Sequence, residues 1–173
     1  MMGSVSIDAQ GKVYLIATAR VEDGGALKII RLDDDGTGSI ESVFGTQYSV
    51  YCPRPITINE LSGEIYVQVY DSTDSYYKYL VLDKNNLAAG FEVINTGYYT
   101  ENPEEITMPS PAIKKTTGEF IFAGGSGLNK VYVYSAGTVR EAFEVNSAIA
   151  TNIISDAGGR LFFGTVNDIS VII

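Results

Sequence analysis

The sequence TNIISDAGGRLFFGT, residues 151–165, shows most clearly how this chain is built. It holds a strand-like segment, a glycine turn, and a second strand in which aromatic and aliphatic residues follow one another. Three earlier stretches repeat this arrangement, namely SVSIDAQGKVYLI (4–16), PITINELSGEIYVQV (55–69) and PAIKKTTGEFIFAG (111–124). The turn glycines, separated by 52, 55 and 41 residues, are Gly11, Gly63, Gly118 and Gly159. The chain is therefore built from four similar units.

The period of the units predicts the architecture. Repeats of this length that contain only strands are typical of β-propeller blades. Alternation of apolar and polar residues, interrupted by turn residues, predicts fifteen strands. They are 4–8, 12–21, 26–32, 39–45, 55–59, 64–71, 76–83, 90–95, 111–115, 119–125, 130–135, 139–146, 151–156, 160–166 and 168–173. We expect an all-β, propeller-like protein with about four antiparallel blades, of which the last lacks its outermost strand.

No linker-like tract interrupts the units, so the sequence predicts a single domain over residues 1–173. The expected blades are residues 1–47, 48–97, 98–147 and 148–173. The chain then forms either a small closed ring or an arc that belongs to a larger ring. An open arc would expose the apolar faces of its two terminal blades, which is unfavourable in water. The sequence therefore suggests a homo-oligomer for any open form.

The fourth copy carries a family resemblance. Its core, DAGGRLFFGT at residues 156–165, resembles the D-x-x-G-x-L-W-x-G-T core of the two-component-regulator propeller repeat. The first copy follows the same scheme from Asp8 to Tyr14, whereas the second and third keep the glycine and lack the leading aspartate. The resemblance covers about ten residues of each unit. It implies blades, in which the aspartate caps the turn and the glycine adopts a positive φ, and it carries no catalytic residue.

Composition excludes several classes of function. The net charge of −9 argues against nucleic acid and anionic membranes as partners, because both require clustered lysine and arginine. No apolar run approaches the ~20 residues needed for membrane insertion. The chain has no histidine, which excludes histidine acid–base catalysis, histidine metal ligands and a Ser-His-Asp triad. Cys52 is the only cysteine, so the chain forms no internal disulfide.

One acidic stretch suggests a metal. Residues 33–41, DDDGTGSIE, place Asp33, Asp35 and Glu41 at relative positions one, three and nine, with glycine at position six. This spacing resembles the calcium loops of integrin-type propellers, and carboxylate oxygens are ligands that calcium prefers. Thr37 stands where that family has an acid. Calcium is the only cofactor that the sequence suggests, and the alternative is an acidic hairpin turn.

The connectors between blades are the expected ligand surface. They gather aromatic and polar side chains that would lie on one face of a propeller. These are Tyr48, Tyr51, Arg54, Tyr98, Tyr99, Glu101 and Asn102. Tyrosine combines an apolar ring with a hydroxyl, which suits stacking on sugars or holding peptides. The alternative is that these tyrosines pack between blades and hold the loops in place.

These features favour a non-enzymatic binding or scaffolding module whose connector face binds a peptide, a protein or a glycan. Two alternatives remain open. In the first alternative, the chain is a propeller hydrolase or lyase that uses carboxylates, with or without calcium. The repeat resemblance would also imply a fragment of a bacterial sensory ectodomain.

Overall fold

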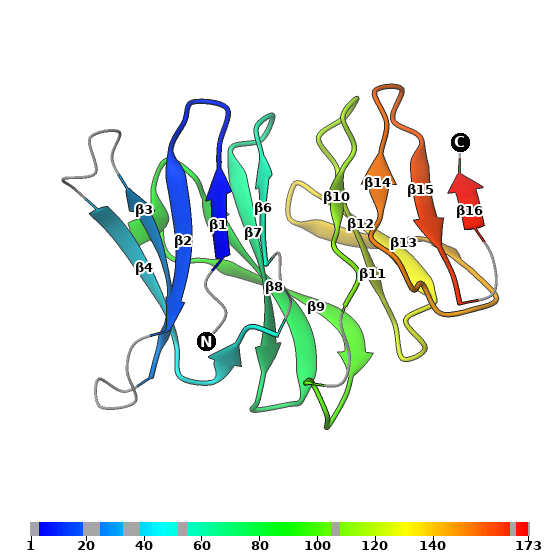
Figure 1. The fold of residues 1–173 in the computed structure, drawn as a ribbon, viewed down its shortest axis with the longest axis horizontal. Coiled ribbons are helices and arrows are strands. Elements are labelled where there is room, and N and C mark those ends of the chain that lie inside the picture. Colours follow the sequence, from blue (N-terminus) through cyan, green and yellow to red (C-terminus); the bar gives the residue numbers. More distant parts are fainter. Residues whose placement is uncertain are drawn as a thin grey trace. The chain divides into compact units, whose positions relative to one another are not determined.

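The computed structural model describes residues 4–18, 25–32, 39–51, 55–104, 108–166 and 169–172. Strands make up just over half of this part of the chain and assemble into four antiparallel sheets (Figure 1). The chain divides into two compact units, Met1–Ile94 and Asn95–Ile173. The prediction of a single domain stays a prediction. No helix in the described residues is long and apolar enough to span a membrane.

The first unit holds two sheets. The first sheet has the order β1-β2-β3-β4, with β1 at Ser4–Ile7, β2 at Val13–Thr18, β3 at Leu27–Leu32 and β4 at Ser39–Gly45. The second sheet has the order β5-β7-β8-β9, and β6 also pairs with β7. Its strands are β5 (Tyr48–Ser49), β6 (Ile56–Asn59), β7 (Glu64–Asp71), β8 (Tyr76–Asp83) and β9 (Glu92–Tyr99). Strand β9 begins in the first unit, and its residues from Asn95 onward belong to the second unit. A 3-10 helix, η2, spans Leu87–Ala89 between β8 and β9.

The second unit holds the other two sheets. The third sheet has the order β10-β11-β12-β13, with β10 at Ala112–Ile113, β11 at Phe120–Gly124, β12 at Lys130–Ser135 and β13 at Thr138–Glu144. The fourth has the order β14-β15-β16, with β14 at Ile154–Ser155, β15 at Leu161–Gly164 and β16 at Ile169–Ile172. The predicted fold class is confirmed: antiparallel blades follow one another along the chain, and the last has three strands among the described residues.

Two strand predictions need correction. The connector between the strands predicted at 39–45 and 55–59 contains a short strand, β5, whose Tyr48 pairs with Asp71 of β7. Strand β9 continues to Tyr99, although the sequence predicts that it ends at Asn95. Both differences arise because pairing with a neighbouring strand extends β structure beyond the limits that local residue preference suggests.

The four glycine turns have the same backbone conformation. Gly11, Gly63, Gly118 and Gly159 have φ of +83°, +74°, +73° and +82°, in the left-handed region that glycine tolerates best. In the first turn, Asp8 Oδ1 accepts hydrogen bonds from the backbone nitrogens of Gln10 and Lys12, at 3.0 and 2.8 Å. The predicted roles of the turn aspartate and glycine are thus confirmed.

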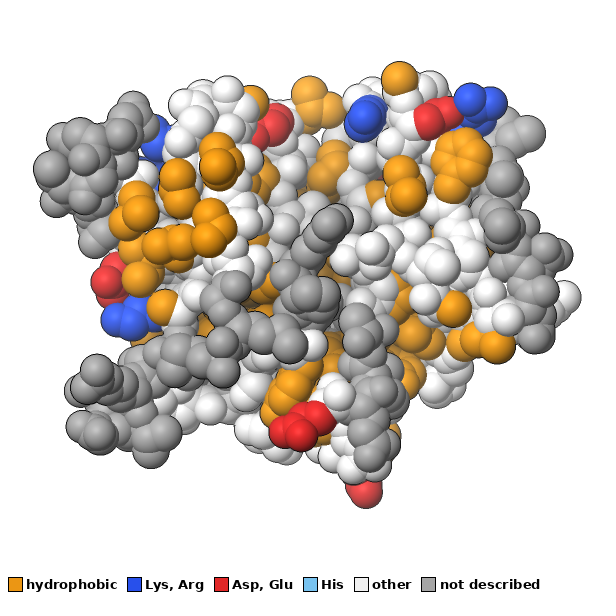
Figure 2. All heavy atoms as spheres, in the orientation of Figure 1, with side chains coloured by type: hydrophobic (Ala, Val, Ile, Leu, Met, Phe, Trp, Pro, Cys, Tyr) orange, Lys and Arg blue, Asp and Glu red, His pale blue; other side chains and the backbone are white. Residues whose placement is uncertain are grey.

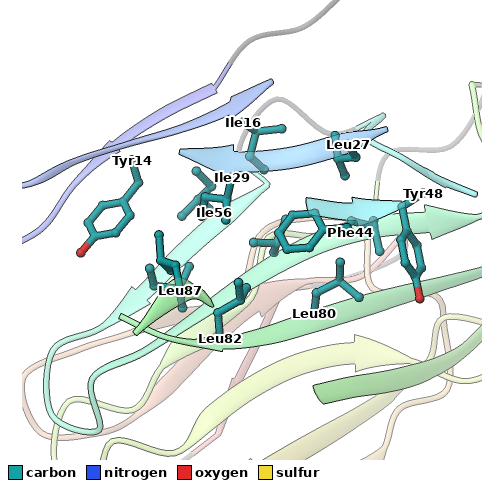
Figure 3. Close-up of a cluster of buried hydrophobic side chains, with 13 residues drawn as sticks. Tyr14, Ile16, Leu27, Ile29, Phe44, Tyr48, Ile56, Leu80, Leu82 and Leu87 are labelled. Carbon is teal, nitrogen blue, oxygen red and sulfur yellow. The ribbon is translucent and has the colours of Figure 1, made fainter. Parts of the chain in front are cut away.

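The core of the first unit lies between its two sheets. Tyr14, Ile16, Leu27, Ile29 and Phe44 from the first sheet pack against apolar side chains of the second sheet and η2 (Figure 3). The contributing residues of the second sheet and η2 are Tyr48, Ile56, Ile65, Val67, Val69, Leu80, Leu82 and Leu87. Tyr14 and Tyr48 lie at opposite ends of this cluster (Figure 3).

The core of the second unit is rich in aromatic rings. Phe122 of β11 stacks on Phe120 and on Tyr132, with ring centroids 5.6 and 5.4 Å apart. Phe143 of β13 stacks on Phe163 of β15 at 6.0 Å and joins the third sheet to the fourth. Every residue of β11 is buried, so both of its faces are covered. A strand covered on both faces needs apolar residues at consecutive positions, which explains the run Phe120–Gly124.

Candidate functional site

The predicted connector residues divide between the two units. In the first unit, Tyr48 is buried with 8% of its surface exposed, and its ring meets Phe91 edge-on at 6.2 Å. Tyr51 is half-buried, and its ring lies edge-on to Tyr70 at 5.9 Å. Both rings therefore make packing contacts. Arg54 lies outside the described residues.

In the second unit, three predicted residues gather at the end of β9. The Tyr99 side chain is 46% exposed, and its hydroxyl donates a hydrogen bond to Glu101 Oε1 at 2.8 Å. Asn102 is exposed, and its backbone nitrogen donates to Thr100 Oγ1 at 3.1 Å. Tyr98 is half-buried, and burial raises the pKa of its hydroxyl. We call Tyr99, Glu101 and Asn102 the connector site.

Strand β9 is anchored to the third sheet just before this site. The backbone nitrogen of Gly125 donates to the carbonyl oxygen of Thr96 at 2.8 Å. Gly124 permits this close approach, because a Cβ atom at that position would collide with the same carbonyl oxygen. The site therefore follows directly on a part of the backbone whose position is set by neighbouring strands.

The predicted calcium ligands are not brought together by any described contact. Asp33 and Asp35 lie outside the described residues. Glu41 lies on β4, where its Oε2 accepts a hydrogen bond from Lys28 Nζ at 3.2 Å. Among the residues that the structure describes, no group of three or more acidic, cysteine or histidine side chains is placed to bind a metal ion. The calcium loop stays a prediction.

A pocket of about 180 Å³ lies between the third and fourth sheets of the second unit. It is lined by Lys114, Glu119, Ile121, Val133, Arg140, Ala142, Phe143, Gly159 and Leu161. Glu119 accepts hydrogen bonds from the Thr117 hydroxyl at 2.9 Å and from Arg140 Nη2 at 3.0 Å. These bonds hold the pKa of Glu119 below its usual value. No sequence motif marks this pocket, because its lining comes from separate strands.

A buried network of charged side chains connects the two sheets of the first unit. Lys84 Nζ lies 3.3 Å from Asp8 Oδ2, 2.7 Å from Glu60 Oε2 and 2.6 Å from Gln10 Oε1. The side chains of Lys84 and Asp8 are 10% and 1% exposed. Burial alone would raise the pKa of Asp8, but hydrogen bonds from the Lys12 backbone and from Lys84 outweigh it and lower that pKa. Lys84 and Asp8 therefore both stay charged, and their network joins the first turn to the end of β8.

Tyr14 extends this network and predicts a response to alkaline pH. Its hydroxyl donates to Asp8 Oδ2 at 3.2 Å, and burial together with the Asp8 charge raises its pKa to about 12 from 10.0. The folded state thus favours the protonated phenol, so this stabilisation is complete below pH 10 and is lost as pH rises through about 12. We expect Tyr14→Phe to weaken the dependence of unfolding free energy on pH in this range. Denaturant unfolding at several alkaline pH values measures the free energy of unfolding of the native chain and of Tyr14→Phe. The same dependence on pH in both proteins would contradict the raised pKa of Tyr14.

The four antiparallel blades define a β-propeller repeat protein. The structure is similar to XC5397, a gluconolactonase from Xanthomonas campestris, with TM-score 0.56 and 13% identity over 97% of this chain and 57% of that one. It is also similar to the β-propeller domain of Cps50 (Swd1) from Myceliophteria thermophila, with TM-score 0.53 and 10% identity over 96% and 49% of the two chains. The chain spans about half the length of these propellers. Its sequence matches no protein-family model and no curated protein.

Proposed function

We propose that this chain is a non-enzymatic binding module and that the connector site forms part of its ligand surface. The proposal rests on Tyr99, whose ring is exposed and whose hydroxyl is held by the hydrogen bond to Glu101. A ring fixed before binding loses little conformational entropy when a ligand stacks on it. The ligand classes that suit such a surface are a peptide, a protein segment or a glycan.

The chemistry of the site supports this reading. The Tyr99 ring offers an apolar face on which a sugar ring or an aliphatic or cationic side chain can stack. Glu101 has a second carboxylate oxygen beside the one that accepts from Tyr99, and the Asn102 side chain can both donate and accept hydrogen bonds. Glu101 and the exposed Glu104 are acidic. We therefore expect a ligand rich in hydroxyl or cationic donors.

The charged groups elsewhere also support binding over acid–base chemistry. Four carboxyl groups in the described part of the chain have clearly shifted pKa values, and all four values are lowered: Asp8, Asp71, Glu119 and Asp156. A carboxyl group that acts as a general acid near neutral pH needs a raised pKa. The calcium-assisted hydrolase or lyase remains a separate proposal that depends on Asp33 and Asp35. The other alternative, a fragment of a bacterial sensory ectodomain, would be supported by a longer reading frame around the chain.

Binding screens with matched variants test the proposal. A glycan array and an array of basic, acidic and aromatic decapeptides would be probed with the native chain, Tyr99→Ala and Val93→Ala. Val93 is a suitable control because it is 48% exposed on the same strand. We expect Tyr99→Ala to weaken binding to the hits about tenfold or more and Val93→Ala to leave it unchanged. Absence of hits on both arrays, or hits insensitive to Tyr99→Ala, would contradict the connector site.

A chelation arm separates the two functional classes. Repeating the screen with EDTA and with Asp33→Asn and Asp35→Asn would reveal a calcium requirement. We expect the connector-site hits to persist under each of these changes. Loss of binding, or of an activity, on chelation and on both substitutions would favour the calcium-assisted alternative.

A further inference from the structure

The pocket between the third and fourth sheets has an apolar floor and a cationic edge. Its floor is one face of the third sheet, because Ile121 of β11 pairs with Val133 of β12, which in turn pairs with Arg140 of β13. Ile121 and Val133 are buried, whereas 59% of the Arg140 side chain is exposed. The row therefore runs from a buried apolar interior to a charged group at the surface.

The fourth sheet and the Phe143 ring complete the walls of the pocket. Leu161 of β15 is buried and lines the pocket, and Phe143 is held by its stacking on Phe163. The apolar lining residues are Ile121, Val133, Ala142, Phe143 and Leu161. An apolar cavity of about 150 Å³ accepts a benzene molecule. The volume of about 180 Å³ in this pocket therefore suits an apolar group of that size.

The charged side chains of the pocket carry an excess of positive charge. Arg140 Nη2 donates a hydrogen bond to Glu119 Oε1 at 3.0 Å, and Lys114 Nζ lies 3.9 Å from Glu119 Oε2. Two positive charges thus face one negative charge, in a chain whose net charge is −9. The bond to Glu119 uses one of the five N–H donors of the Arg140 guanidinium. The exposed guanidinium can therefore bind a second, external carboxylate.

Lys114 is held beside the pocket by its backbone and by the fourth turn. Its nitrogen donates to the carbonyl oxygen of Glu119 at 2.8 Å. Its side chain lies close to Gly159, where an added Cβ would lie 3.2 Å from Lys114 Cε. Figure 2 shows basic, acidic and hydrophobic side chains together over the turns that join β10 to β11 and β14 to β15. Groups that are placed before binding lose little entropy when a ligand arrives.

We propose that this pocket binds a small, free monocarboxylate with an apolar body, as a site separate from the connector site. The apolar body lies between Val133 and Leu161, and the carboxylate binds Arg140 and Lys114. A guanidinium matches the planar shape of a carboxylate, and a single negative charge balances the excess charge of the pocket. A mostly apolar lining with a few placed polar groups is typical of small-ligand sites.

Nuclear magnetic resonance titration of the isotope-labelled chain with phenylacetate tests the proposal. We expect saturable shifts of the backbone amides that line the pocket, with a dissociation constant on the order of 1 mM for a ligand of about ten non-hydrogen atoms. Phenylacetamide lacks the charge and acetate lacks the ring. Each should bind about tenfold more weakly or worse.

Four variants locate the ligand. Arg140→Gln should weaken phenylacetate binding about tenfold, and Glu119→Gln should strengthen it about threefold, because a like charge is removed. Ala142→Leu, at an exposed lining position, should block the pocket and abolish binding. Arg160→Gln is the matched control for Arg140, because its side chain is 57% exposed, also pairs with a carboxylate and does not line the pocket. It should leave the affinity unchanged.

Several outcomes would overturn the proposal. Absence of shifts at the lining residues up to the solubility limit of phenylacetate excludes the site. Equal binding of phenylacetamide, or affinity unchanged by Arg140→Gln with native circular dichroism, excludes a role for the cationic edge. Tighter binding of benzylamine, benzyl phosphate or N-acetylphenylalanine would assign the pocket to a cation, a phosphate ester or a peptide C-terminus instead. Tyr99→Ala should not alter phenylacetate binding, so this test is independent of the connector site.

Discussion

Replacing Asp8 with alanine is expected to lower the free energy of unfolding by roughly 3–5 kcal/mol. The substitution removes the acceptor for two backbone nitrogens of the first turn and the hydroxyl partner of Tyr14. It also leaves the buried Lys84 ammonium, 10% exposed, with one carboxylate fewer. A buried charge that loses its partner costs far more than a surface ion pair, because water cannot replace the lost interaction. Urea unfolding followed by far-ultraviolet circular dichroism measures the change.

The fourth turn offers a matched control for Asp8. Asp156 occupies the equivalent position, accepts from the backbone nitrogen of Arg160 at 2.9 Å and pairs with the Arg160 side chain at 2.6 Å. The Arg160 side chain is 57% exposed, so water replaces most of that interaction. Asp156→Ala should therefore destabilise the protein much less. Equal losses for the two variants would show that turn capping, and not the buried network, accounts for the effect of Asp8.

Truncating Phe122 to alanine should destabilise the second unit by about 3–5 kcal/mol. The Phe122 side chain is fully buried, and its ring stacks on Phe120 and Tyr132. Strand β11 is covered on both faces, so neighbouring side chains cannot close the cavity without disturbing the sheet. Hydrogen exchange of the backbone amides in β11 and β12 would localise the loss, and urea unfolding would give its size.

Two comparisons make the Phe122 prediction specific. Phe122→Leu keeps most of the buried volume and should cost only about 1–1.5 kcal/mol. Val139→Ala, at a position 42% exposed on β13 of the same sheet, should change stability by less than about 0.5 kcal/mol. A Phe122→Ala loss no larger than that of Val139→Ala would contradict the tight packing of this core.

The strands and turns of all four blades are predictable from the sequence because their signals are local. A strand face is visible in alternate residues, and the turn needs only an acceptor side chain and a glycine three residues later, as at Asp8 and Gly11. Strand β5 and the last residues of β9 carry no such local signal. In both cases the extra strand residues follow from pairing with other segments, which no local pattern encodes.

The connector residues show where local reasoning ends. Tyr48 and Tyr99 are the same residue type in predicted connectors, yet Tyr48 is buried against Phe91 and Tyr99 is exposed beside Glu101. Their difference depends on whether a neighbouring element covers the ring. The pocket around Glu119 and the network around Lys84 were likewise missed, because their members meet only after separate strands assemble.

The series of antiparallel blades with glycine turns follows from the amino-acid sequence, since alternation and turn chemistry act within about ten residues. Which tyrosines pack and which face water depends on the assembly of the sheets. The assembly also brings Lys84 beside Asp8. The physical reason is that burial and ion pairing depend on distances between residues far apart in the chain, and only the assembled sheets set those distances.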